Sequence, residues 1–200
     1  MSAVCKISVF VSGSGGNLQA IMDAEITGLR IAPVVCDNPG ARAIERARGG
    51  GLPIEVVDRA GFSSREDFEA EIVSRLDRHT PDLIALAGFM RILSPDFIKQ
   101  FEGRIINIHP SLLPDFPGKR AVKRALDSGA RRTGCTVHFV DEGVDTGPVI
   151  KQADVSIAPD DTEQTLAEKI HIQEHRIYPE VLTLFAEGRI KLDGGKVVFS

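Results

Sequence analysis

Short hydrophobic runs alternate along the chain with longer stretches in which apolar residues recur every three or four positions. The short runs are typical of buried strands, and they predict strands at residues 4–11, 31–36, 54–57, 83–87 and 104–108. The longer stretches are typical of amphipathic helices, and they predict helices at residues 17–25, 41–48 and 64–78. Such alternation is typical of a parallel sheet that helices cover on both faces.

Beyond Pro110 the pattern changes. It predicts a proline-rich loop, a short helix, two strands and one long helix, at residues 111–118, 122–126, 133–140, 149–157 and 162–185. Because only a short loop joins the two strands, we expect them to pair antiparallel, which would make the sheet mixed. Thr162 stands where it can cap the long helix.

These elements predict one α/β domain over residues 1–200, with a Rossmann-like, open, mostly parallel but mixed sheet. The candidate boundary near Pro110 is interpreted as a seam within that sheet, between residues 1–110 and residues 111–200. The chain has 200 residues, of which 42% are hydrophobic, and that is enough to bury the core of one domain.

Charge and cysteine content narrow the class of protein. The formal net charge is -4, without the basic excess of a duplex-binding protein, so we expect no nucleic-acid partner. No apolar run approaches the roughly 20 residues that span a bilayer, so we expect no membrane association. The first strand pattern runs directly into a glycine loop, which argues against a signal peptide. Cys5, Cys36 and Cys135 are widely spaced, as expected of reduced thiols in a cytoplasmic protein.

A glycine-rich loop, SGSGGN at residues 12–17, joins the first strand to the first helix. Backbone N–H groups at a helix N-terminus bind anions, and glycine allows a phosphate to approach closely. The loop has no P-loop lysine, and Leu18 replaces the third glycine of a dinucleotide fingerprint. We therefore predict a site for a single phosphate at Gly15, Gly16 and Asn17. The alternative is a tight strand-to-helix turn with Asn17 as the cap.

Two polar residues close the strand predicted at 104–108. Alternation along a strand places Asn107 and His109 on one face, at the sheet edge where open α/β sheets bind ligands. An amide and an imidazole side by side suit acyl transfer, because both can donate to a developing oxyanion. An acidic loop further on, with Asp141 and Asp145, would raise the pKa of His109 if a carboxylate reached it. The alternatives are a structural histidine and a solvated turn.

At these residues the chain resembles a known family. NIHPSLLP at residues 107–114, AGFMRILS at residues 87–94 and the aspartate loop at residues 140–148 resemble the folate-dependent formyltransferases, in that family's order and spacing. The resemblance extends over nearly the whole chain. It implies formyl transfer from 10-formyltetrahydrofolate, as co-substrate, to the amine of glycinamide ribonucleotide. It implies no metal, and it leaves the chain as a monomer or a homodimer.

The family's functional residues carry over to matching positions. Its catalytic trio corresponds to Asn107, His109 and Asp145. The segments that bind the folate correspond to Arg65, Met90, Arg91, Ile92, Leu93, Asp141, Glu142, Gly143 and Val144. The segments that bind the phosphorylated substrate correspond to Gly15, Gly16, Asn17, His171 and Glu174. In this scheme residues 1–110 form the phosphate-binding half, and residues 111–200 carry the folate and catalytic loops.

The residues themselves support these roles unevenly. His171 and Glu174 are three apart on one helix face, a spacing that suits a cis-diol, although an exposed helical pair is the alternative. Met90, Ile92 and Leu93 are apolar and can equally be plain core. Two positions depart from the family pattern: His171 replaces an expected glutamine, and Lys119-Arg120 follows the Pro-Gly pair where many relatives have a histidine.

Three rival interpretations remain open. A formyltetrahydrofolate hydrolase would use water in place of the amine, and such relatives carry a domain ahead of the core, for which the early first strand leaves no room. A methionyl-tRNA formyltransferase carries a C-terminal RNA-binding extension, and the acidic charge balance disfavours tRNA. A non-catalytic nucleotide-binding module could use Asp37, at the end of the second strand, to bind a ribose.

Overall fold

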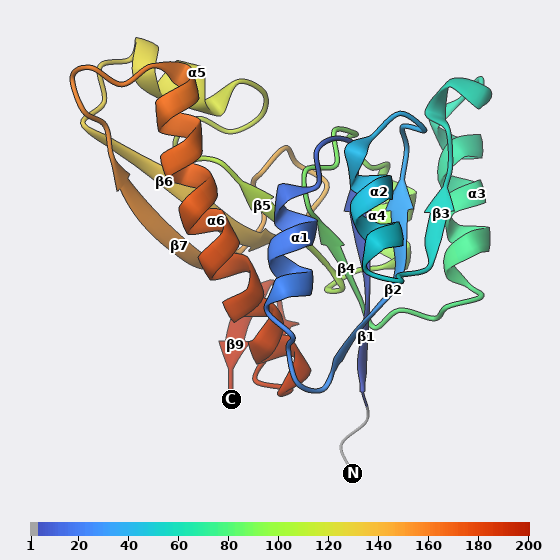
Figure 1. Cartoon of the computed structure of the whole chain (residues 1–200). Helices are drawn as coiled ribbons and strands as arrows, with labels where there is room; N and C mark the ends of the chain where they lie inside the picture. The colour runs from blue at the N-terminus through green and yellow to red at the C-terminus, as the bar shows by residue number, and fades with distance from the viewer. Residues whose placement is uncertain (1–3) are drawn as a thin grey trace.

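A computed structural model describes residues 4–200 and has an open α/β architecture (Figure 1). The main sheet has seven strands in the order β3-β2-β1-β4-β5-β6-β7, and a separate hairpin is formed by β8 and β9. The strands are β1 Cys5–Val11, β2 Leu29–Cys36, β3 Ile54–Val56, β4 Leu83–Leu86, β5 Ile105–His109, β6 Arg132–Phe139, β7 Val149–Ser156, β8 Ile190–Asp193 and β9 Lys196–Phe199. The helices are α1 Gly16–Asp23, α2 Arg42–Gly49, η1 Arg59–Gly61, α3 Arg65–Leu76, α4 Pro95–Gln100, α5 Ala121–Asp127 and α6 Glu163–Ala186.

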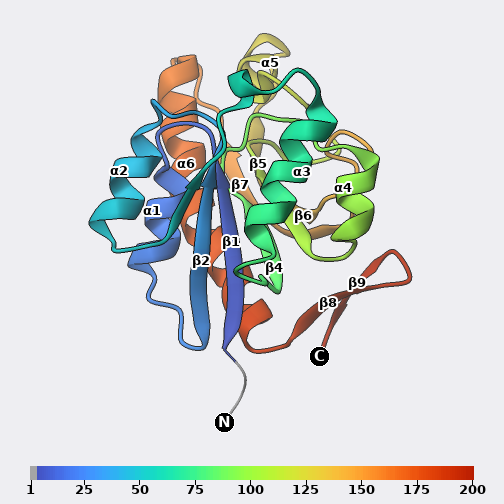
Figure 2. The ribbon, with the colours of Figure 1, turned by 90° about the vertical axis from the view of Figure 1, so that its right-hand side faces the viewer.

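Helices cover both faces of the sheet, as predicted. Val9 and Val11 of β1 point to one face and pack with apolar residues of α1, α2 and α6. Phe10, between them, points to the other face and packs with α3 and α4. Figure 2 shows α1, α2 and α6 on one side of the strands and α3 and α4 on the other. Because both faces are covered, the inner strands are hydrophobic at almost every position.

The sheet is mixed, as the short loop after Phe139 predicts. β1 to β5 are parallel, while β5 pairs antiparallel with β6, and β6 pairs antiparallel with β7. In the β5–β6 register Asn107 lies opposite His138, and His109 lies opposite Thr136. One continuous sheet therefore joins the half before Pro110 to the half after it.

The sequence patterns missed three elements. α4 begins with Ser94, whose hydroxyl accepts the N–H of Phe97, and has proline in its first turn, but six residues are too few to show helical periodicity. The turn η1 has three residues, and the strands β8 and β9 have four each, so they too are too short to show a pattern. All three cysteines are free; Cys36 and Cys135 are buried, and Cys5 is partly exposed.

Candidate active site

Three segments from distant parts of the chain meet at the carboxyl ends of the parallel strands. The glycine loop follows β1, residues 87–93 follow β4, and Asn107 and His109 close β5. Ser12 links the first two, because its hydroxyl accepts the N–H of Met90 at 2.8 Å and its N–H donates to the Gly88 carbonyl at 3.1 Å. This edge of the sheet is where open α/β proteins bind ligands.

Asn107, His109 and Asp145 converge. The Asn107 amide donates to Asp145 Oδ1 over 3.4 Å, and His109 Nδ1 lies 3.2 Å from Asp145 Oδ2. Asp145 comes from the loop between β6 and β7 and has a left-handed backbone, with φ of 56°. Aspartate tolerates this conformation better than most residues, and it places the carboxylate over the end of β5.

His138 is a fourth member of this cluster, and the sequence patterns did not single it out. Its ring is buried, its Nδ1 lies 2.8 Å from the Phe139 carbonyl, and its Nε2 lies 3.3 Å from the Asn107 amide and 3.6 Å from Asp145 Oδ1. A carbonyl only accepts, so Nδ1 donates to it, and Nε2 faces both Asn107 and Asp145. The available signal was a histidine on a predicted strand, but its contact depends on the β5–β6 register.

The loop after Pro110 closes over the same groups. His109 Nε2 donates to the Phe116 carbonyl at 3.0 Å, and the Gly118 N–H donates to Asp145 Oδ2 at 2.7 Å. Arg124 donates to the Pro117 carbonyl, and its guanidinium lies over the Phe116 ring. Both His109 nitrogens therefore face oxygen acceptors, and one acceptor belongs to a loop.

Burial decides the direction in which the pKa of His109 is shifted. Burial lowers this pKa below its ordinary value, and the Phe116 carbonyl and the Asp145 charge raise it by less. The charge of Asp145 does raise the pKa of His109, as predicted, but desolvation, which the sequence analysis did not consider, lowers this pKa by more. Burial raises the pKa of Asp145. Hydrogen bonds from His138 and Gly118 and the charge of His109 lower this pKa by more, so it lies below its ordinary value.

A cavity of about 430 Å³ opens beside the cluster. Asn107, His138 and Asp145 form part of its wall, and segments 89–93, 118–121 and 140–145 form much of the rest. Met90 and Ile92 are 69% and 63% exposed, so two large apolar side chains stand at the cavity rather than in the core. An apolar cavity with a few convergent polar groups is the usual form of a small-molecule site.

The two predicted folate arginines lie in different places. Arg91 lines the cavity, and its Nε donates to Asp37 Oδ2 at 2.5 Å, with the Asp37 side chain fully buried. Asp37 is thus held in an ion pair through Oδ2, and its other carboxylate oxygen is buried, whereas the nucleotide-binding alternative requires a carboxylate that is accessible to a ribose. Arg65 begins α3, pairs with Glu66 at 3.6 Å, and is not among the described residues that line the cavity.

The glycine loop forms the start of α1. Gly15 has φ of 75°, and a Cβ there would lie 2.8 Å from that of Ala43, so the turn requires glycine. A Cβ on Gly16 would lie 3.1 Å from His175 Nε2. Asn17 does not cap the helix; its amide instead donates to Glu174 Oε2 at 3.0 Å, which brings the predicted phosphate turn and the predicted ribose residue together.

Glu174 and His171 differ in environment. Glu174 is 4% exposed, and burial raises its pKa, while the Asn17 hydrogen bond and the charge of His171 lower it by less. His171 is exposed and stacks on His175 with ring centroids 6.2 Å apart. A buried carboxylate beside a glycine turn is a ready acceptor for hydroxyl groups.

Neither a candidate metal-binding cluster nor a membrane-spanning helix occurs among the described residues 4–200. No group of three or more His, Cys, Asp or Glu is arranged to hold a metal ion. Within the same residues, no helix is both long and apolar enough to cross a bilayer.

Comparison with known proteins gives a consistent set of relatives. A family model described as formyl transferase matches residues 5–182. The phosphoribosylglycinamide formyltransferase of Escherichia coli K12 is 43% identical over 191 residues, which cover 94% of this chain and 90% of that protein. The trifunctional purine biosynthetic protein adenosine-3 of Drosophila melanogaster is 45% identical over 188 residues, covering 92% of this chain. The chain spans only 14% of the length of that trifunctional relative.

The similar solved structures belong to the same kind of protein as the sequence relatives. A glycinamide ribonucleotide transformylase from Symbiobacterium toebii superposes with a TM-score of 0.95 at 45% identity, covering 100% of this chain and 95% of the other. An open α/β sheet with a polar cluster at its strand ends, facing an apolar cavity, defines a small-molecule enzyme of the Rossmann-like class. Within that class, the chain belongs to the formyl transferase family.

Proposed function

We propose that this chain transfers a formyl group from 10-formyltetrahydrofolate to the amine of glycinamide ribonucleotide, producing formylglycinamide ribonucleotide for purine synthesis. The observation that carries the proposal is the junction of Asn107, His109 and Asp145 with the cavity on one side and the glycine turn on the other. The names of the relatives, which include glycinamide ribonucleotide transformylase, support the same reaction.

The donor would occupy the cavity of about 430 Å³. Its flat pterin suits walls that contain Met90, Ile92 and Leu93, and the loop at residues 141–144, which also lines the cavity, would supply backbone hydrogen bonds. Arg91 would meet a folate carboxylate with the edge of its guanidinium that Asp37 leaves free. Arg65 would need to approach from outside the cavity.

The acceptor would lie on the side of the glycine turn. The N–H groups around Gly15, Gly16 and Asn17 would bind the phosphate at the start of α1. Glu174, beside Asn17, would accept hydrogen bonds from the ribose hydroxyls, with His171 one turn away on the same helix. The amine would then point toward the ends of β4 and β5, where the donor's formyl group sits.

The residues at this junction suit attack on a carbonyl carbon. An α-amino group has a pKa of about 8, so a useful fraction of the amine is neutral and nucleophilic at neutral pH. His109 Nε2, which donates to the Phe116 carbonyl, would instead donate to the formyl oxygen once the loop moves aside. Asn107 would donate to the same oxygen as it becomes an oxyanion. Formation of the new C–N bond would give this tetrahedral oxyanion. The bond to the folate nitrogen would then break as the carbonyl forms again, and one proton would move from the attacking to the leaving nitrogen.

The test is a spectral assay of the folate with the purified chain. We expect the spectrum to change when both 10-formyltetrahydrofolate and glycinamide ribonucleotide are present, and not when either is omitted. The Asp145→Asn protein serves as the control for background hydrolysis. Turnover without the amine would favour the hydrolase, and the absence of any turnover by folded protein would favour a binding module.

A further inference from the structure

Two buried carboxylates have no part in the reaction proposed above. Among the residues that the structure describes in 4–200, the buried acidic side chains are Asp37, Glu69 and Glu174. Burying a carboxylate is costly unless its oxygens are bonded, so each buried acid needs a physical explanation. Glu174 lies beside the glycine turn, on the acceptor side of the site. Asp37 and Glu69 remain.

Both of these carboxylates hold the same stretch of chain, residues 88–94, which we call the wall segment. Asp37 follows β2, and its Oδ2 accepts from Arg91 Nε at 2.5 Å. Glu69 lies on α3, and its Oε1 accepts the N–H of Ser94 at 2.8 Å. Its other oxygen accepts from the Ser94 hydroxyl. Two elements that are distant in sequence therefore hold the middle and the end of the wall segment.

The wall segment forms one side of the candidate donor site. Residues 89–93 line the cavity of about 430 Å³ beside Asn107 and Asp145. The segment lies between β4 and α4 and belongs to no helix or strand, so no regular backbone ladder fixes its shape. Ser12 holds its first part through the N–H of Met90, at 2.8 Å. Beyond Met90, the polar contacts that fix the segment include those to Asp37 and Glu69.

Asp37 is bonded in a way that suits positioning better than stability. Its side chain is fully buried, yet Oδ1 has no hydrogen-bond partner among the described residues. A buried oxygen without a partner lowers stability, so the pair is a poor source of folding free energy. Arg91, in contrast, has a side chain that is 46% exposed and lies at the cavity. The main effect of the pair is to fix Arg91 and the backbone that carries it.

We propose that Asp37 and Glu69 are positioning residues for the formyl donor, which hold the wall segment in its binding shape before the donor arrives. This inference rests on the proposed function. Without either carboxylate, the segment would sample more conformations in the free protein, and binding would have to order it again. Affinity for the pterin would fall, while the groups that act on the formyl carbon would keep their contacts.

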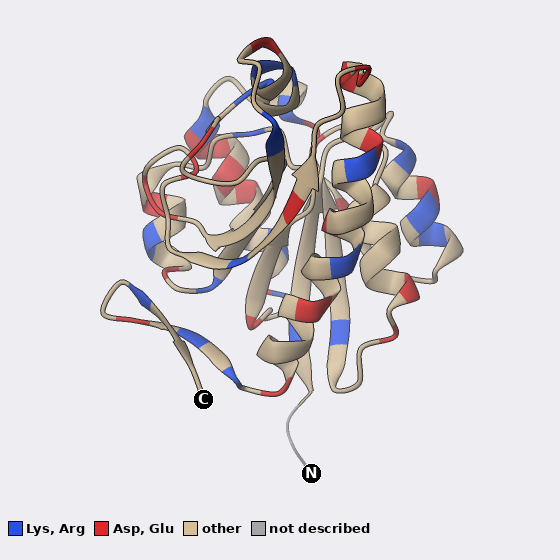
Figure 3. Cartoon of the chain, turned by 90° about the vertical axis from the view of Figure 1, so that its left-hand side faces the viewer, with Lys and Arg blue, Asp and Glu red and all other residues tan. Residues whose placement is uncertain are grey.

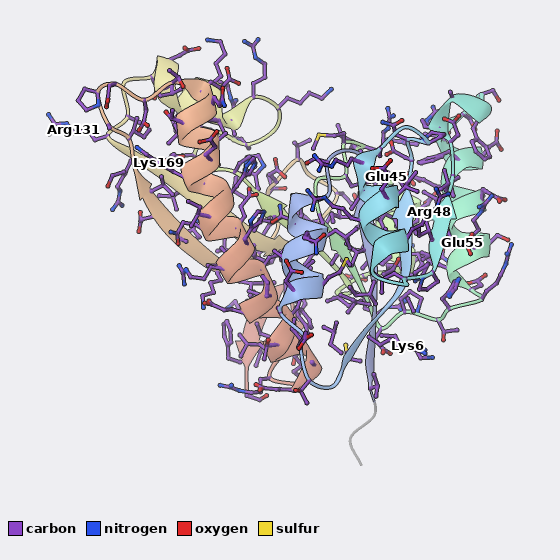
Figure 4. All side chains as sticks on the ribbon, viewed as in Figure 1. Lys6, Glu45, Arg48, Glu55, Arg131 and Lys169 are labelled. Carbon is purple, nitrogen blue, oxygen red and sulfur yellow. The ribbon has the colours of Figure 1, made fainter. Side chains whose placement is uncertain are left out.

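The test uses Asp37→Ala and Glu69→Ala, with Asp37→Asn and Glu69→Gln as conservative variants that keep an acceptor oxygen. The control is Asp161→Ala, which removes a carboxylate that pairs with Lys169 at 2.7 Å and does not line the cavity. Figure 4 shows Lys169 on α6, on the other side of the molecule from α3. The control also matches the loss of one negative charge, on a surface where Figure 3 shows both signs interspersed.

Three quantities are measured for each protein: the KM for each substrate, kcat, and the Kd of tetrahydrofolate by calorimetry without the acceptor. We expect each alanine variant to raise the donor KM and the Kd of tetrahydrofolate about tenfold, the order expected when one or two residues lose their order. The values of kcat and of the KM for glycinamide ribonucleotide should stay within about twofold, because only donor binding is weakened. The conservative variants should show smaller increases, and the control none.

Urea unfolding checks that each variant is folded. If Glu69→Ala does not fold, Glu69→Gln and Asp37→Ala carry the test. Unchanged donor KM and Kd in folded Asp37→Ala, or an equal increase in Asp161→Ala, would overturn the inference. A fall in kcat with no change in donor affinity would overturn it as well. Wild-type protein that binds tetrahydrofolate but transfers no formyl group would count against the proposed function alone, whereas wild-type protein that binds no folate would overturn both.

Discussion

At the scale of single residues, the candidate site depends on where the two His109 nitrogens point. One faces the Asp145 carboxylate at 3.2 Å, and the other faces the Phe116 carbonyl at 3.0 Å. A carboxylate that also receives the N–H of Gly118 holds the imidazole in one orientation. The remaining N–H is then aimed at a carbonyl oxygen, which is the kind of group that a formyl donor would present there.

We expect Asp145→Asn to reduce kcat by at least about tenfold with little change in folding, because the amide no longer fixes the charge and orientation of His109. His109→Ala should cost as much or more, since the donor itself is lost. Steady-state turnover gives the effect, and circular dichroism controls for the fold. Near-normal turnover of either folded variant would remove that residue from the mechanism.

The lowered pKa of His109 also predicts how stability depends on pH. Burial holds this pKa below the value of about 6.5 that histidine has in an unfolded chain, so the unfolded chain binds the proton more readily. Its contribution to the free energy of unfolding is therefore complete above that pH, and acidification through the window below it removes the contribution.

We expect His109→Asn to lose less stability than the wild type between pH 7.5 and pH 5.5, as measured by urea unfolding at both values. Asparagine removes the titrating group at this position, and the other four histidines serve as the shared background. An identical loss of stability in the two proteins would contradict a His109 pKa that folding lowers.

At the scale of elements, the start of α1 combines a demanding turn with a candidate anion site. Gly15 is required by its backbone conformation and by Ala43, whereas Gly16 has only the tip of the His175 ring near it. A side chain at Gly16 is therefore tolerated by the fold more easily than one at Gly15. Gly16 is the position that can separate binding from stability.

We expect Gly16→Asp to raise the KM for glycinamide ribonucleotide by about tenfold or more, because a carboxylate would repel the phosphate at the helix N-terminus. Gly16→Ala is the matched control, since it adds the Cβ without the charge and should have a smaller effect. An unchanged KM in a folded Gly16→Asp protein would show that the phosphate binds elsewhere.

At the scale of the whole molecule, the two halves share one sheet. β5 of the first half is hydrogen-bonded to β6 of the second, and α6 of the second half packs against α1 and β2 of the first. The buried Tyr178 of α6 donates its hydroxyl to the Leu86 carbonyl of β4 at 3.0 Å. Without the second half, the face that α1 and α2 cover loses α6, and without the first half β6 loses its partner β5.

We therefore expect a single cooperative unfolding transition for the chain, as proposed for one domain over residues 1–200. Calorimetry and urea unfolding followed by two probes should give coincident transitions. Two separated transitions, one of them preserved in a fragment that ends near Pro110, would contradict the single domain.

Local patterns alone predicted most of the fold and much of the candidate site. The strands, the longer helices and the mixed sheet follow from hydrophobic periodicity and loop length, which are properties of neighbouring residues. The convergence of Asn107 and His109 follows from strand alternation. Elements as short as α4 were missed because fewer than two helical turns show no period.

Tertiary structure decided the rest, because it depends on burial and on partners far apart along the chain. The contact of His138 with Asn107 requires the register between β5 and β6, and the pairing of Arg91 with Asp37 joins residues 54 positions apart. The pKa of His109 is lowered where its neighbour alone predicted a rise, because desolvation exceeds the effect of one carboxylate. The sequence determined which chemical groups the protein has. Packing determined which of these groups contact one another and how burial shifts their pKa values.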